Sequence, residues 1–135
     1  MEEMNRKVEK VLLKGNVMSL ASIDEDGFPR PVPMQKIGSE GANIVWFATG
    51  MGSSKVYNYR NDAKAGLSLY LDHNSIVMTG IVDIVTDKAI KAKLWQESFV
   101  EYFPKGVDDP DFVLLKFTGK KASVWIDKDF AKLTF

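Results

Sequence analysis

The segment Val17–Gln35, VMSLASIDEDGFPRPVPMQ, carries the signals of a complete β-hairpin. Its first part, VMSLASI, is short and mostly apolar, which is typical of a buried strand. The pair Asp26-Gly27 follows, and glycine adopts the positive φ that a tight turn needs. The second part has three prolines at alternate positions between residues 29 and 33. Because proline has no backbone N–H for a ladder, we expect this strand at a sheet edge, or with one side facing something other than a strand.

Further along the chain, short apolar or alternating segments separated by turn residues indicate more strands. Gly80 interrupts the longest of them and indicates a bulge or a close backbone contact. The spacing of Trp95, Phe99 and Phe103 at four-residue steps is typical of a helix. We expect strands at residues 44–47, 66–71, 75–85, 112–117 and 122–126, and helices at residues 2–14, 54–61 and 87–103.

Hairpins in succession favour antiparallel pairing, and a long sheet in a small domain tends to close on itself. The chain offers six or seven such strands. We therefore predict a mainly β (α+β) fold, a small antiparallel β-barrel with helices on its outside. No repeat or linker divides the sequence, so residues 1–135 are expected to form one domain.

The composition excludes several classes of function. Lys+Arg and Asp+Glu both number 18, and a general nucleic-acid binder usually has a basic excess. Without cysteine there is no disulfide and no thiolate nucleophile. The first ten residues are charged throughout, unlike a signal peptide, and no run of 18 apolar residues predicts a membrane span. We expect a cytoplasmic protein that binds neither nucleic acid nor membrane.

The loop in Phe47–Lys55, FATGMGSSK, allows two interpretations. It matches neither the triphosphate loop, which needs glycine before the lysine, nor the dinucleotide fingerprint. It does lead from a strand into the start of a helix, where free N–H groups and the helix dipole favour an anion. Thr49, Ser53 and Ser54 offer hydroxyl donors, and Lys55 offers a charge. The alternative is an ordinary helix cap by Ser53 or Ser54.

Arg30 is a candidate second cation for a phosphate, since its guanidinium binds oxyanions in a bidentate manner. We expect the strand at residues 44–47 beside the proline-rich strand, which would bring Arg30 toward Lys55. The alternative is a solvated surface arginine. His73 is expected in a surface turn, and Asp108–Asp111 in a solvated loop, so no metal site is predicted. With so few acid–base groups, an enzyme of this sequence would depend on a cofactor for its chemistry.

The order of these segments resembles a known family. The chain has FPRPVPM after the DEDG turn, then IVWFATGMGSSK, then LSLYL, and late in the sequence LWQESFVEYFPKG and ASVW. In this order, over roughly Lys7 to Ile126, it resembles the pyridoxamine 5′-phosphate oxidase-like FMN-binding split barrels, and among them the small general stress proteins.

The resemblance implies a six-stranded antiparallel split β-barrel with flanking helices. It also implies a homodimer with FMN at the interface. By position, Arg30 and Lys55 would hold the flavin phosphate with Ser54 beside it, and Ser53 belongs to the same loop. The backbone of Arg30, Pro31, Val32, Pro33, Met34 and Gln35 would run along the flavin ring, Ala48 and Thr49 would also touch FMN, Ser75 takes the position of a flavin-contacting glutamine, and Trp125 would reach the flavin from the partner chain.

The sequence also departs from the oxidase that gives the family its name. Gln35 stands where that enzyme has a substrate-binding lysine, and the residues after Trp125 lack its Arg-x-His set. We therefore expect an FMN-dependent oxidoreductase that acts on another small-molecule redox substrate. One alternative is a flavin-binding stress module without turnover. Another is a related cofactor, a deazaflavin or haem.

Overall fold

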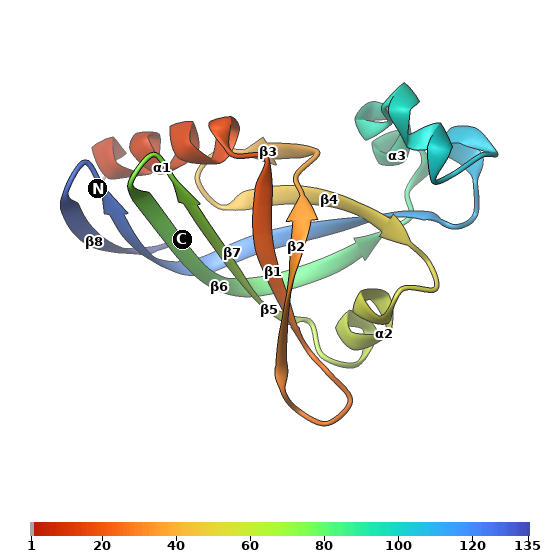
Figure 1. Cartoon of the computed structure of the whole chain (residues 1–135), viewed down its shortest axis with the longest axis horizontal. Helices are drawn as coiled ribbons and strands as arrows, with labels where there is room; N and C mark the ends of the chain where they lie inside the picture. Colours follow the sequence, from red (N-terminus) through yellow and green to blue (C-terminus); the bar gives the residue numbers. More distant parts are fainter. Residues whose placement is uncertain (1) are drawn as a thin grey trace.

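The chain folds into one curled antiparallel sheet flanked by helices, as the computed structural model shows for residues 2–135 (Figure 1). The predicted mainly β split-barrel fold is confirmed. The sheet runs in the order β2-β1-β5-β6-β7-β4-β3, and β8 adds to β7. The strands are β1 (Val17–Ile23), β2 (Pro29–Gln35), β3 (Gly38–Glu40), β4 (Ile44–Gly50), β5 (Lys64–Leu71), β6 (Asn74–Val85), β7 (Phe112–Ile126) and β8 (Asp129–Thr134). The helices are α1 (Glu2–Lys14), α2 (Ser54–Asn61), α3 (Lys88–Leu94) and the 3-10 turns η1 (Glu97–Glu101) and η2 (Gly106–Asp108).

The proline-rich strand β2 lies at an edge of the sheet, as predicted. It pairs with β1 alone, whereas β4 pairs with β3 and β7. The expectation that β4 lies hydrogen-bonded beside β2 is therefore wrong. Within the described chain no ladder joins β2 to β4, so the barrel stays open on this side.

Strand β7 is the longest element and replaces the two closing strands expected from the sequence. It pairs with β6 on one side, while on the other its first half pairs with β4 and its second half with β8. The ladder shifts register at Thr79/Gly80, which confirms the predicted irregularity. A Cβ on Gly80 would lie 2.1 Å from the Thr118 carbonyl oxygen, so only glycine fits there. This bulge lets β7 continue through Gly119, which lies between the two strands expected at residues 112–117 and 122–126.

The structure has eight strands where the family resemblance implied six, counted over residues 2–135. The short β3 and the terminal β8 were not predicted. Strand β8 carries only one buried side chain, that of Leu133, so its apolar alternation is weak. It forms because the second half of β7 offers a free edge.

The helix expected at residues 87–103 is also wrong in part. Helix α3 ends at Leu94, because Trp95 and Gln96 have extended backbones before η1 begins. This break turns the Trp95 ring edge-on to Phe99 and Phe112, at centroid distances of 5.5 and 5.2 Å. The four-residue aromatic spacing therefore reflects a shared cluster around Phe112 and not one continuous helix.

Two apolar cores stabilise the fold. The larger fills the curl of the sheet and includes the buried face of α1, formed by Val8, Val11 and Leu12. The smaller contains Trp46, Phe103, Phe112 and Leu114, with the aromatic residues after α3 packed against it. Every helix in the described part of the chain is too short or too polar to cross a bilayer.

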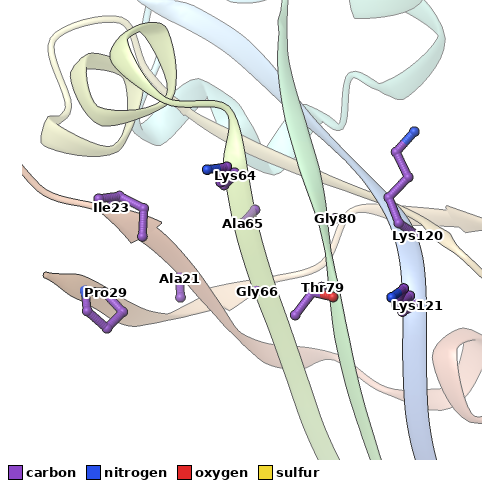
Figure 2. A pocket seen from close by; sticks show the side chains of 10 residues that line it. All are labelled: Ala21, Ile23, Pro29, Lys64, Ala65, Gly66, Thr79, Gly80, Lys120 and Lys121. Atoms are coloured by element: carbon purple, nitrogen blue, oxygen red, sulfur yellow. The ribbon is translucent and has the colours of Figure 1, made fainter. Parts of the chain in front are cut away.

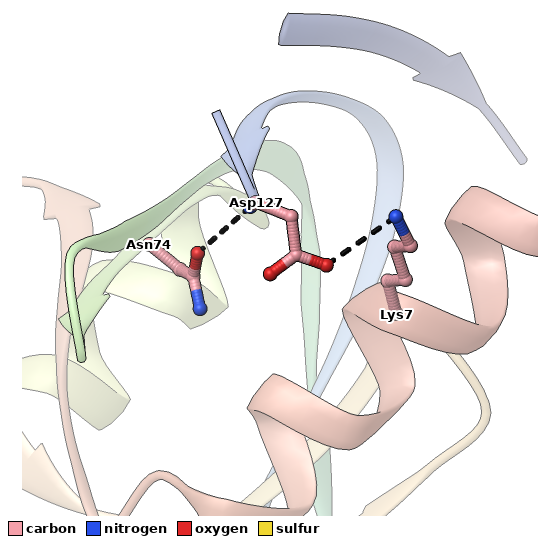
Figure 3. Close-up of polar contacts among 3 residues, drawn as sticks. All are labelled: Lys7, Asn74 and Asp127. Carbon is pink, nitrogen blue, oxygen red and sulfur yellow. Dashed lines mark hydrogen bonds and ion pairs between the residues drawn. The ribbon is translucent and has the colours of Figure 1, made fainter. Parts of the chain in front are cut away.

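Polar contacts fasten α1 to the sheet at its middle and at its end. Midway along the helix, Lys7 pairs with Asp127 in the β7–β8 turn at 3.3 Å, and the Asp127 N–H donates to the Asn74 side chain at 3.1 Å (Figure 3). At its end, the Lys36 ammonium donates to the carbonyl oxygens of Leu12 and Leu13 at 2.7 and 2.8 Å. Lys36 follows β2 directly, so this contact also fixes the end of the edge strand.

Candidate functional site

The loop after β4 begins helix α2 with a conventional cap. Ser53 is the N-cap residue, and its hydroxyl accepts from the Lys55 N–H at 3.1 Å. The capping interpretation is therefore confirmed for Ser53. The cap leaves the Ser53 hydroxyl proton free to donate and places Ser54 and Lys55 in the first turn. Asp111, which precedes β7, also anchors this loop, because the Met51 N–H donates to the Asp111 backbone and side-chain oxygens at 2.8 and 2.9 Å.

A buried hydrogen bond sets the position of α2 relative to β2. The Asn58 amide donates to the Ser22 hydroxyl at 3.0 Å, and both side chains are buried. Ser22 of β1 is the ladder partner of Arg30. The Tyr59 hydroxyl adds a bond to the Ala21 carbonyl oxygen at 3.0 Å. The helix that carries Lys55 is therefore tied to the strand that borders Arg30.

Arg30 and Lys55 are close enough to influence each other. The pKa of the Lys55 ammonium lies below its ordinary value of 10.5, first because burial disfavours the charge and second because the Arg30 cation does. Within residues 2–135 neither cation forms an ion pair with a carboxylate. Arg30, Ser53 and Ser54 line one hollow of ≈ 590 Å³, across which lies the acidic turn Asp24–Asp26. Three of the four predicted phosphate-binding residues thus line one hollow, and Lys55 lies near Arg30 but lines the neighbouring cleft.

A second hollow of ≈ 620 Å³ opens on the other side of Lys55, between β2 and β4. Five of the positions predicted to contact the flavin line it. They are Pro33, Met34 and Gln35 from β2, and Ala48 and Thr49 from β4. Pro31 and Val32 lie on the stretch of β2 between this hollow and Arg30. The split side of the barrel thus presents a polar hollow with Arg30 and a separate cleft with Lys55, and both border the edge strand β2.

The backbone of β2 suits a ligand along its free edge. The Lys36 N–H donates to the Asn16 carbonyl oxygen, so the even-numbered residues of this strand direct their N–H groups toward β1. The three prolines have odd numbers and therefore face outward, where no ladder donor is missed. Gln35 has the one outward backbone N–H between residues 29 and 35.

Ser75 and Trp125 are not part of this site within one protomer. They are ladder partners of each other, and they lie at the end of β7 opposite to Val113, which pairs with Thr49. Trp125 is 45% exposed. A contact between Trp125 and the cleft therefore requires a second chain.

The far wall of the cleft was missed by the sequence prediction. It consists of η1 and neighbouring residues, because the break after α3 turns this segment toward β2 and β4. Asp111 is exposed in a loop, as expected, and it also lies beside Gly50 and accepts from the Met51 N–H. The wall comprises Gln96, Ser98, Phe99, Glu101, Tyr102, Phe103 and Asp111.

Asp109, also expected in a solvated loop, is buried. Its carboxylate accepts from the Asp111 and Lys105 N–H groups at 2.9 and 3.1 Å. The Asp111 bond is the largest cause that lowers the Asp109 pKa, and the Lys105 bond adds to it. Asp109 therefore shapes the loop that leads to the cleft.

Another hollow, of ≈ 510 Å³, lies over the small residues around the β6–β7 bulge (Figure 2). Lys64, Lys120 and Lys121 border it, and its floor includes Gly66 and Gly80. None of the predicted site residues lines it, and it has neither an aromatic nor an acidic side chain. Within residues 2–135 no three His, Asp or Glu side chains are placed to hold a metal ion.

Comparison with known proteins supports the resemblance seen in the sequence. Residues 3–135 match the protein family described as "Pyridoxamine 5'-phosphate oxidase like". No curated protein matches the sequence.

Solved structures resemble the whole chain. A Clostridium acetobutylicum protein related to general stress protein 26 of the pyridoxinephosphate oxidase family has a TM-score of 0.85 at 21% identity, over 100% of this chain and 96% of its own. The general stress protein 26 of Bacillus anthracis has a TM-score of 0.80 at 22% identity, over 97% and 99% of the two chains. A Nostoc punctiforme protein described as pyridoxamine 5'-phosphate oxidase-related and FMN binding has a TM-score of 0.74 at 13% identity, over 99% and 95%.

Proposed function

Because this chain belongs to the pyridoxamine 5'-phosphate oxidase-like family, we propose that it binds FMN and serves as a flavin-dependent oxidoreductase for a small molecule other than pyridoxamine phosphate. The observation that carries the proposal is the convergence of Arg30 and Lys55 on the capped start of α2. The FMN-binding description of the Nostoc protein agrees with it.

The residues present fit the phosphate of FMN. Burial and a neighbouring cation destabilise the charge of Lys55, and a bound dianion would relieve the second effect and offset the first. The start of α2 adds backbone N–H groups and the positive end of the helix dipole. Beside Lys55, the small side chains of Ala48 and Thr49 leave room for a flat ring, and Gln35 offers an outward N–H. When bound, FMN would supply the hydride and electron transfer, while the chain provides binding, orientation and shielding from water.

The first experiment asks whether flavin is bound and reduced. The purified protein should show the visible absorbance of oxidised flavin, and mass spectrometry of the released chromophore should identify FMN and distinguish it from FAD, a deazaflavin or haem. Under anaerobic conditions, NADH or NADPH should reduce the bound flavin faster than free FMN. A protein that ignores added FMN would refute the proposal, whereas bound flavin without faster reduction would favour a non-catalytic flavin-binding module.

The pH dependence of FMN affinity is a further expected result. Affinity should fall below about pH 6, where the dianion of a phosphate ester takes up a proton and becomes a monoanion. It should also fall on the alkaline side, because the dianion binds the charged form of Lys55. Since the pKa of Lys55 is lowered, this fall should begin at a lower pH than for an ordinary lysine. In Lys55→Arg the alkaline fall should disappear, because arginine stays charged; an unchanged profile would contradict the role of Lys55.

We also propose that two copies form a homodimer through the outward face of the sheet. One cross-strand row on this face contains Tyr70, Ser75, Trp125 and Phe130, and the three aromatic side chains are exposed. Exposed aromatic rows of this kind are typical of interfaces. A second copy would cover the open cleft and offer Trp125 to it, as the family resemblance implies.

Sedimentation should therefore give twice the mass of 15.1 kDa. Trp125→Ala should weaken the dimer roughly 30-fold, the effect of losing one interface hot spot, and should weaken FMN binding with it. Phe28→Ala, which removes an exposed aromatic from the β1–β2 turn, is the matched control and should change dimerisation little. A monomer that holds FMN with wild-type affinity would contradict this arrangement.

A further inference from the structure

The cleft between β2 and β4 has one wall without an assigned role. On its near side are the residues that would hold FMN. On its far side are residues of η1 and its flanks, chiefly Phe99, Glu101 and Tyr102. None of these belongs to the phosphate-binding or ring-binding positions described above, so they are free to contact a second molecule beside the flavin ring.

This wall is held firmly in place. The Phe99 ring packs edge-on to Trp95 and lies 6.1 Å from the ring of Phe112, which is fully buried. The N–H groups of Tyr102 and Phe103 both donate to the Phe99 carbonyl oxygen at 2.9 Å. Within a single chain Tyr102 is 74% exposed, and it lines the cleft. The wall therefore offers aromatic surface on a fixed backbone.

The charged side chains of the cleft differ in whether they already have a binding partner. The Lys36 ammonium is used by the carbonyl oxygens of Leu12 and Leu13, and Lys55 is assigned to the phosphate. Asp111 holds the Met51 N–H. The Glu101 carboxylate is exposed and forms no ion pair within the described chain. With Lys55 assigned to the phosphate, the remaining charged side chains that line the cleft are one cation, Lys36, and two carboxylates, Glu101 and Asp111, so their net charge is negative.

From these contacts we infer that the η1 wall selects the substrate: it binds planar aromatic molecules that are uncharged or cationic and rejects those with a phosphate or carboxylate. Tyr102 and Phe99 provide a stacking surface, on which a flat ring gains contact area and quadrupole attraction. Glu101 attracts a cation and repels an anion. The inference rests on the proposed function, since it takes the near side of the cleft as the flavin site.

Three ligands with one ring system test the inference, namely 1-methylquinolinium as the cation, quinoline as the neutral molecule and quinoline-2-carboxylate as the anion. FMN loading is measured first by absorbance, and affinities are then measured by calorimetry on the loaded protein. The cation should bind about tenfold tighter than the anion, since attraction in one case and repulsion in the other each contribute roughly threefold near a protein surface. The neutral ligand should lie between them.

Two variants separate charge from stacking. Glu101→Gln keeps the shape of the side chain and should reduce the tenfold preference to about twofold, while quinoline binds as before. Tyr102→Ala should weaken all three ligands equally, by about threefold to tenfold. Glu3→Gln on α1 removes the same charge at a distance and should change nothing.

The outcomes are separable from the test of flavin binding. Failure to load FMN refutes the proposed function, whereas a protein that loads FMN and shows no preference between the three ligands refutes the inference alone. The inference is overturned if the anion binds as well as the cation, if no ligand binds, or if Glu101→Gln leaves the preference intact. Calorimetry reads affinity alone, so the result does not depend on turnover.

Discussion

The double variant Arg30→Ala/Lys55→Ala should lose almost all affinity for FMN. Each side chain is expected to donate charge-assisted hydrogen bonds to the phosphate, and bonds to charged groups contribute about 1.5–3 kcal/mol each. Two such losses weaken binding by about 3–6 kcal/mol, which is roughly a 10²- to 10⁴-fold rise in Kd. The purified variant should therefore be colourless, and titration with FMN followed by flavin fluorescence should give the Kd.

The fold itself should tolerate this change. The protein loses two neighbouring like charges, one of which has a pKa lowered by burial and by the other cation. Removing them relieves repulsion, so the thermal midpoint should stay the same or rise slightly. Ser53 still caps α2, and the Asn58–Ser22 bond still ties the helix to β1.

A matched control removes the same residue types where no ligand is expected. Arg6→Ala/Lys10→Ala takes one arginine and one lysine from the exposed side of α1, so the net charge changes equally. FMN affinity should then stay within about twofold of the wild-type value, because distant surface charges are largely screened. If both double variants lost FMN to the same extent, total charge and not the convergence of Arg30 and Lys55 would explain binding.

The hairpin of β1 and β2 could be predicted because its signals are local. An Asp-Gly pair permits the turn, and alternate prolines restrict β2 to an edge, whatever the rest of the chain does. The cap at Ser53 is local in the same sense. These features define the edge strand β2 and the start of α2. They are two of the three surfaces of the candidate site, and the η1 wall is the third.

Other parts of the site depend on contacts between distant residues. Arg30 and Lys55 meet because Asn58 bonds to Ser22, and no spacing in the sequence shows that pairing. Likewise, a four-residue aromatic spacing fits both a helix and a cluster around one buried ring. The aromatic rings pack around Phe112, which favours the cluster over one continuous helix. The break in the helix that results forms the η1 wall.

Phe112→Ala is expected to be the most destabilising single change in the smaller core. The Phe112 side chain is fully buried, its ring centroid lies 5.2, 6.1 and 5.1 Å from those of Trp95, Phe99 and Phe103, and the Lys91 ammonium lies 5.1 Å from it. Truncating a buried phenylalanine costs about 3–5 kcal/mol. For a domain of this length, the thermal midpoint should fall by about 10–20 °C.

Calorimetry checks the fall in midpoint, with Phe28→Ala as control. That side chain is 66% exposed, so its loss should cost less than about 0.5 kcal/mol. Because the η1 wall packs on Phe112, the Phe112→Ala variant should lose the preference for the cationic over the anionic ligand at temperatures where FMN still binds. The phosphate site rests mainly on α2, β1 and β2, which pack on the larger core, and its loop is linked to the Phe112 region through the bonds between Met51 and Asp111. A midpoint within 2 °C of the wild type, or FMN loss before the loss of ligand preference, would mean that the aromatic cluster does not support the wall.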